Sequence, residues 1–502
     1  MKKLLLVLFC LCGLAWGAYQ VFPIFKSLYT FENGSSSGPA PGVRNPSLDA
    51  YDPNAPLRAI DVDAMASRMK EYKDIYQKLR DDALAVHARL HPAGSKHSKE
   101  EATAIRLAAY LWVWGDFYKE GLSKTFIEYV RRIESNSESG GDPLLNEVSD
   151  IECMQSFYPN EDSRVEELKK RAELLQNSDY PEAFKFWASV FMVQMLNKVE
   201  GHPQFKQPMA KSIALMPEMA GRMVEQYAAL YKERLPDYLL YLKGTDCLDN
   251  AQNDAGALAS TAAGIDRIFE SEAPSSVVRP SLQGRFYVDY AWNARGSDWA
   301  NTVTNEGWRL MNERLVKAGE ILEKAAMNHP GEKMIAHNMM TVELGQGSGR
   351  DRMEKWFHTA IDTDPDDFKA YDSKLYYLLP RWYGSDEEIW KFGLECAKTQ
   401  NWEARIPMVL VSAMEDAAIN NPRIYANTEI WKVLEVVFRG YLQHYPESTI
   451  YRSKFAKYAA QGEHWEIAKQ QFAVLGNEWD RDVFSDEEYV SMKRDAEQNA
   501  KK

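Results

Sequence analysis

Two histidines four residues apart are the first side chains in the sequence that could bind a metal ion. His87 and His91 would lie on one face of a helix, with His97 close behind. Ala88, however, stands where the zinc-protease pattern HExxH needs glutamate. Basic side chains just before Pro92 are also typical of a helix C-terminus, where they offset the helix dipole. We therefore predict no metal site and no cofactor.

Two other segments only partly resemble ligand-binding loops. Residues 344–357, LGQGSGRDRMEKWF, carry three glycines, but Arg350 stands where GxGxxG spacing needs the last glycine, and no strand is expected before them. The acidic run Asp362, Asp364 and Asp366 lacks the glycine and closing glutamate of a calcium loop. We predict turns between helices at both places.

Tryptophan and arginine, which dominate protein interfaces, gather in residues 290–308 and in residues 378–390. Each segment can instead be a corner between two helices, in which tryptophan packs between hairpins and arginine pairs with a carboxylate or a helix end. We favour the corner and keep six residues as candidates for binding a partner. They are Trp292, Arg295, Trp299, Arg381, Trp382 and Tyr383.

Local chemistry explains most of the second segment, LLPRWYGSDEEIW. Pro380 cannot continue a helix, and Gly384 allows a turn. Ser385 and Glu388 form a capping box for a following helix. The buried face of that helix is expected at Ile389, Phe392 and Cys396.

No local motif indicates catalysis. There is no GxSxG elbow, and spacing nominates no Ser/His/Asp or Cys/His set. Glycan hydrolysis needs a pair of carboxylates, and nothing singles out such a pair among 73 acidic residues. We predict a non-enzymatic protein, with a cell-wall glycan-binding protein or hydrolase as the alternative.

Composition narrows the class of protein. The 502 residues are 45% hydrophobic, which is enough for a large core. The net charge of −13 is spread along the chain without a basic stripe, which argues against nucleic acid as a partner.

The amino terminus predicts export. Residues 1–25 begin with two lysines and an apolar run, and Ala15 and Gly17 have the spacing of a signal-peptidase site. The alternative is a retained membrane anchor over residues 4–25. Either reading places the body in the periplasm or another extracytoplasmic space, and only this segment would touch a membrane. Residues 26–59, rich in Gly, Ser, Pro and Asn, are expected to form a flexible linker.

The cysteines of the body leave two alternatives open. Cys153, Cys247 and Cys396 allow at most one disulfide, which an oxidising compartment would permit. A bridge between Cys153 and Cys247 is one alternative. The other is that all three are small buried hydrophobic residues.

From about residue 60, nearly every window has helical periodicity. Prolines and serines in residues 271–281 suggest a boundary between a helical domain at 60–275 and a second one at 276–502. In the second domain a pattern of four residues, ending in proline, recurs after 35 and then after 81 positions. Its copies are Ala318, Leu322, Ala325 and Pro330; Met353, Phe357, Ala360 and Pro365; and Leu434, Phe438, Tyr441 and Pro446.

This pattern resembles the tetratricopeptide repeat, a helical hairpin whose second helix is ended by proline. The resemblance implies an all-α fold, a superhelix or solenoid of hairpins that is most regular in the C-terminal half. The segments AWNARG and PRWYGS also resemble an uncharacterised bacterial family of helical-repeat proteins, many of them exported, with AWxARG and PRWxGS segments. Because stacked hairpins present extended surfaces, we predict an interaction scaffold of the bacterial cell envelope that binds a protein or peptide partner.

Overall fold

The computed structural model describes residues 61–500, apart from 68, 70, 93–97, 116–128, 130–141, 154–161, 202–209, 253, 297–299 and 481. The predicted leader and linker lie outside the described residues, as do His97, Trp299 and the side chain of Cys153. Within the described part of the chain, no helix is both long and apolar enough to cross a membrane.

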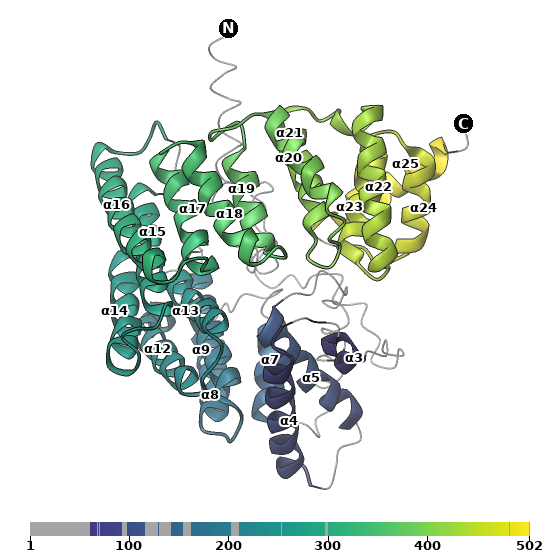
Figure 1. Ribbon diagram of the computed structural model, residues 1–502. Helices are drawn as coiled ribbons and strands as arrows, with labels where there is room; N and C mark the ends of the chain where they lie inside the picture. Colours follow the sequence, from purple (N-terminus) through teal and green to yellow (C-terminus); the bar gives the residue numbers. More distant parts are fainter. Residues whose placement is uncertain are drawn as a thin grey trace. The chain divides into compact units, whose positions relative to one another are not determined.

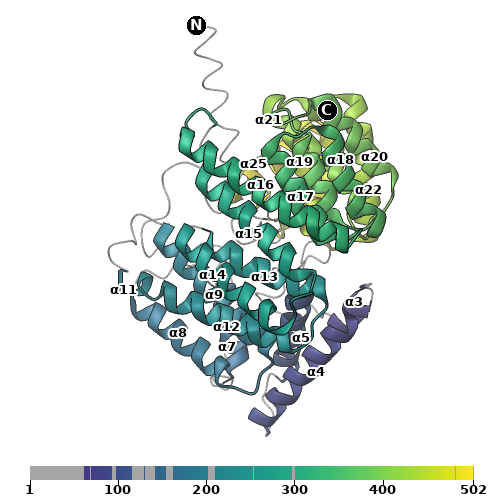
Figure 2. The same ribbon diagram turned by 60° about the vertical axis from the view of Figure 1, so that its left-hand side comes forward.

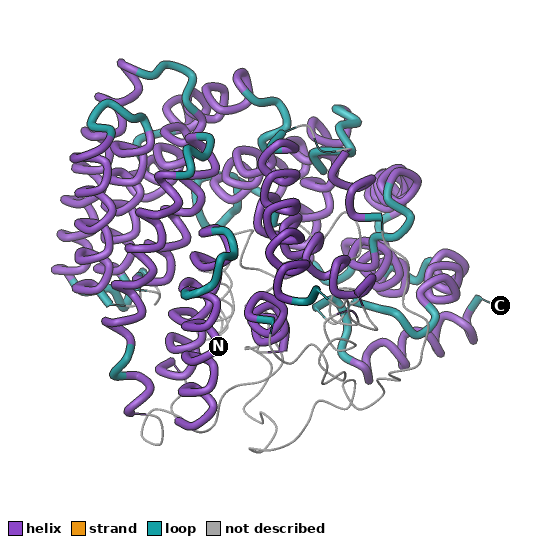
Figure 3. The backbone as a smooth tube through the Cα atoms, turned by 90° about the horizontal axis from the view of Figure 1, so that it is seen from below, coloured by secondary structure: helices purple, strands orange, loops and turns teal. Residues whose placement is uncertain are grey.

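Every regular element in the described ranges is a helix, and these ranges contain no strand (Figure 3). The predicted all-α class is thereby confirmed. Packing divides the chain within helix α16, between Ile321 and Leu322, into an N-terminal unit and a C-terminal unit. The boundary predicted near residue 275 lies in the loop between α14 and α15, inside the N-terminal unit.

The N-terminal unit packs its helices around a core that includes α12, which contacts α9, α13 and α14 (Figure 2). Met223, Tyr227 and Leu230 of α12 recur at helical spacing and are at most 1% exposed. The helices are α3 (Val62–Ser67), α4 (Lys73–Leu90), α5 (Ser98–Trp114), α7 (Pro143–Cys153), α8 (Asp162–Gln176), α9 (Glu182–Gly201), α11 (Ala210–Ile213), α12 (Met216–Lys232), α13 (Asp237–Ala251), α14 (Ala255–Glu272), α15 (Val278–Arg295) and the part of α16 (Asn305–Asn328) before Leu322.

A buried ion triad joins α13 to α15. Arg285 lies 2.7 Å from Asp249 and 2.7 Å from Asp289, and none of the three side chains is more than 8% exposed. One guanidinium thus neutralises two carboxylates that have almost no access to water.

In the C-terminal unit, helices that are neighbours in sequence pack together, such as α17 with α18, α20 with α21 and α23 with α24 (Figure 1). The elements are α17 (Lys333–Gln346), α18 (Arg350–Thr363), α19 (Phe368–Tyr377), α20 (Asp386–Lys398), η3 (Ile406–Met408), α21 (Val409–Asn420), η4 (Ile424–Ala426), α22 (Thr428–His444), α23 (Thr449–Gln461), α24 (Trp465–Leu475) and α25 (Asp486–Asn499).

The recurring sequence pattern corresponds to helix faces that are buried in the same way. Its first three positions lie in α16, α18 and α22, and each proline lies in the loop that follows the helix. The exposed fractions are at most 4% for Ala318, Leu322, Ala325, Met353, Phe357, Ala360, Leu434, Phe438 and Tyr441.

Other local predictions hold as well. The glycine-rich segment forms the turn between α17 and α18, where Gly347 has a φ of 63° and Gly349 a φ of 106°. Cys247 and Cys396 are buried free thiols, so the disulfide from Cys247 to Cys153 is absent. The alternative, buried cysteines acting as small hydrophobic residues, is confirmed for these two.

Candidate functional site

The corner predicted between two helices is present. Helix α19 ends at Tyr377 and α20 begins at Asp386, after the N-cap residue Ser385. The Ser385 hydroxyl oxygen accepts a hydrogen bond from the Glu388 backbone N–H at 3.2 Å. The expected buried face of α20 is also found, since Ile389, Phe392 and Cys396 are at most 5% exposed.

Arg381 forms a buried ion pair that is only partly hydrogen-bonded. Its Nη1 atom lies 3.3 Å from Asp416 Oδ1, and the Asp416 side chain is 3% exposed. The Nε and Nη2 atoms of Arg381 and the Oδ2 atom of Asp416 have no hydrogen-bond partner among the described residues. Burial, although opposed by Arg381, raises the pKa of Asp416 to about 6. Burying charged groups whose hydrogen bonds are incomplete costs free energy, so this pair is not a source of stability for the corner.

The next two residues contact neighbouring helices: Trp382 contacts α19, and Tyr383 contacts α17. The Trp382 ring centroid lies 5.8 Å from that of Tyr376, in the last turn of α19. The Tyr383 hydroxyl donates a hydrogen bond to the Leu344 carbonyl oxygen at 3.0 Å. Tyr383 is still 44% exposed, so it connects the corner to the surface.

The second predicted group lies at the end of α15, apart from Trp299, which is outside the described residues. The Arg295 guanidinium is 5.6 Å from the centroid of the Trp292 ring and 5.4 Å from that of Trp308, in the first turn of α16. Trp308 itself is 39% exposed. The structure thus joins an arginine and a partly exposed tryptophan that the sequence did not pair.

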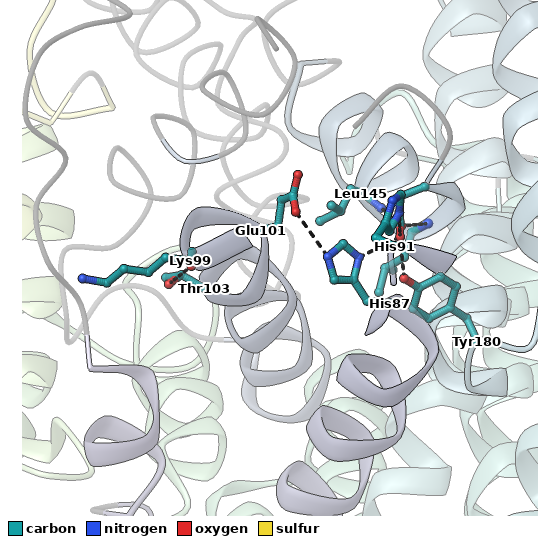
Figure 4. Close-up of polar contacts among 9 residues, drawn as sticks. His87, His91, Lys99, Glu101, Thr103, Leu145 and Tyr180 are labelled. Atoms are coloured by element: carbon teal, nitrogen blue, oxygen red, sulfur yellow. Dashed lines mark hydrogen bonds and ion pairs between the residues drawn. The ribbon is translucent and has the colours of Figure 1, made fainter. Parts of the chain in front are cut away.

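A buried polar cluster surrounds His87, at a place where the sequence predicted only a helix end (Figure 4). His87 Nδ1 lies 2.9 Å from Asp142 Oδ2, and His87 Nε2 lies 3.3 Å from Glu101 Oε2. His91 Nε2 lies 3.2 Å from the same Asp142 oxygen, to which the Tyr180 hydroxyl donates at 2.8 Å. Helix α4 with its C-cap residue His91, helix α5, and the segments just before α7 and α9 thus contribute to one buried network.

Asp142 also begins a helix. Its Oδ1 atom accepts hydrogen bonds from the backbone N–H groups of Leu144 and Leu145, each at 3.0 Å, at the start of α7. The sequence Asp142-Pro143 could have revealed this cap, because proline favours the first helical position. It could not have shown that the other carboxylate oxygen faces two histidines.

The carboxylates and the imidazole of this cluster stabilise one another's charged forms. Burial opposes the ionisation of Asp142, but hydrogen bonds from His87, Leu145 and Tyr180 outweigh it and lower the pKa of the carboxyl. Burial likewise disfavours a charged His87, yet Asp142 and Glu101 raise the pKa of its imidazole. Such a set of titratable side chains is typical of a binding or catalytic site, and equally of a structural ion pair.

A cavity of about 350 Å³ lies elsewhere in the N-terminal unit, between α13, α14, α15 and α16. Apolar side chains such as Phe286 and Tyr287 line most of it, and Asp266 and Arg279 stand on its wall. The binding residues predicted from the sequence do not line this cavity.

Residues 342–406 match the model of a family described as a domain of unknown function, DUF4034. The matched segment spans α18, α19, the corner with Arg381, Trp382 and Tyr383, and α20. No curated protein and no solved structure matches the chain.

Proposed function

We propose that the protein is a non-enzymatic interaction scaffold of the bacterial cell envelope, built as a tetratricopeptide-like solenoid of helical hairpins. The observation that carries the proposal is the equivalent burial of three repeated helix faces, which end at Ala325, Ala360 and Tyr441. Repeated hairpins that bury the same positions stack on one another and present long surfaces to a partner. The export signal read from residues 1–25 supports the compartment.

The partner is a protein or peptide segment, and the exposed aromatic and arginine side chains are the first candidates to contact it. Trp308 with Arg295 in the N-terminal unit and Tyr383 in the C-terminal unit belong to the residue types that carry most binding energy at interfaces. A rigid aromatic ring loses little conformational entropy when it is covered.

The scarcity of exposed tryptophan among the described residues favours this function over glycan binding. Sugar rings stack on exposed, coplanar aromatic rings. Of the tryptophans that the structure describes, Trp308 is the only exposed one, at 39%, and Trp112, Trp356 and Trp431 are each 3% exposed. The other eight described tryptophans are partly exposed.

The test is crosslinking and affinity purification of the tagged full-length protein from the cell envelope, with and without digestion of the glycan wall. We expect a defined protein to co-purify after digestion and to be reduced by Trp308→Ala. Met327→Ala is the matched control, because Met327 lies on the same helix and is 78% exposed. Recovery only with undigested wall, unaffected by Trp308→Ala, would instead favour a glycan-associated protein.

A further inference from the structure

We infer that His87, His91 and Asp142 form a binding site for one divalent transition-metal ion, for which Zn²⁺ is the best match. The three side chains offer ligand atoms that all lie within 4.8 Å of one another. Two imidazoles and one carboxylate are a ligand set that zinc accepts, with a water molecule in the remaining position. This site is independent of the proposed scaffold function.

The helices bring the ligand atoms to suitable separations. His87 and His91 lie one turn apart at the end of α4, with ring centroids 4.7 Å apart. Asp142 Oδ2 is 2.9 Å from His87 Nδ1 and 3.2 Å from His91 Nε2. Tetrahedral bonds of about 2.0–2.2 Å place ligand atoms roughly 3.5 Å apart, so the two separations from Asp142 to the histidines are already close to those that an ion requires.

The neighbouring contacts are those that orient metal ligands. Glu101 lies 3.3 Å from His87 Nε2, so when Nδ1 binds an ion, the Nε2–H donates to this carboxylate and fixes the tautomer. The backbone N–H groups of Leu144 and Leu145 hold Asp142 Oδ1, which leaves Oδ2 for the ion. Glu101 thus orients His87, and the first turn of α7 orients Asp142.

Without a metal ion, Asp142 Oδ2 is surrounded by more hydrogen-bond donors than one carboxylate oxygen readily accepts. Three donors meet at Asp142 Oδ2: His87, His91 and the Tyr180 hydroxyl, at 2.9, 3.2 and 2.8 Å. A carboxylate oxygen has about two lone-pair positions for such donors. A metal ion that replaces the two imidazole protons would leave the ion and Tyr180 on this oxygen. The His91 side chain, 21% exposed, provides the open side of the site.

The test uses the purified full-length protein, stripped of metal with a chelator and titrated with Zn²⁺ by calorimetry, with bound zinc counted by mass spectrometry. We expect one ion per chain and a higher melting temperature with zinc. His91→Gln should weaken binding by about 10-fold or more, while its amide can still donate to Asp142. Glu101→Gln should weaken binding by about 10- to 100-fold through the orientation of His87.

Two further variants make the result decisive. Asp142→Asn retains an N-cap residue, because asparagine also caps helices, but removes the anionic ligand. His358→Gln is the matched control, because His358 lies 4.0 Å from Asp362 on an exposed helix face. It should bind zinc as the unchanged protein does. Failure of the unchanged protein to bind zinc, or equal binding by His91→Gln and Asp142→Asn variants that remain folded, would overturn the metal site.

Discussion

Gly384 lies against the backbone of Leu378. A Cβ atom at Gly384 would stand 2.0 Å from the Leu378 carbonyl oxygen and 2.5 Å from its carbonyl carbon. Both distances are too short for any residue that has a Cβ atom. Glycine is therefore required here by the close approach of two backbone segments. This contact closes the loop that carries Arg381, Trp382 and Tyr383.

We predict that Gly384→Ala destabilises the protein by about 3 kcal/mol, because the backbone must move to admit the methyl group. Urea unfolding followed by circular dichroism measures the change. Gly221→Ala is the control: this glycine lies in α12 with nothing within 4 Å of an added Cβ, so alanine should leave stability unchanged or raise it. Equal effects of the two substitutions would contradict the steric argument.

Trp382→Ala should cost about 3 kcal/mol of unfolding free energy, because the indole packs against Tyr376 between two helices. Tyr383→Phe removes only the hydrogen bond to Leu344 and should cost about 1 kcal/mol. Thermal unfolding of both variants tests the order of the two effects. If Trp382→Ala left the melting temperature unchanged but abolished partner binding, Trp382 would be a contact residue and not a part of the corner.

Asp416 predicts a pH dependence of opposite sign to that of most carboxylates. The pKa of this carboxyl is about 6 in the folded protein against an ordinary value of 3.8, so between these values the folded chain binds a proton that the unfolded chain releases. Its contribution to the free energy of unfolding should thus rise by roughly 1 kcal/mol as the pH falls from 7 to 5. Unfolding of the unchanged protein relative to Asp416→Asn at both pH values isolates this group. A relative stability that stays flat or falls toward pH 5 would rule the prediction out.

Two arginines test the effect of burial on otherwise similar ion triads. Arg285→Met should destabilise the protein by about 3–5 kcal/mol, because it leaves the carboxylates of Asp249 and Asp289 buried without their cation. Arg309 pairs with Glu306 and Glu313 on the surface, and Arg309→Met should have little effect. Chemical denaturation of both variants gives the comparison, and a larger loss from Arg309→Met would refute it.

The sequence predicted the helices and their ends because these depend on residues within one or two turns. The cap formed by Ser385, the turn at Gly347 and the buried repeat ending at Ala360 were all readable from local spacing. The exposure of Trp308 could not be predicted from the sequence, because the helical period defines a face of the helix but not what covers each position on that face.

What the sequence alone determined is the all-helical class, the corner after α19 and the arginine and tryptophan types gathered there. Only the tertiary structure brought Asp142 to His87 and His91, and Asp416 to Arg381. These partners lie 35 to 55 residues apart in the chain, and no local rule links them. Charged and titratable side chains acquire partners through the packing of whole helices, which follows the burial of apolar faces along the chain.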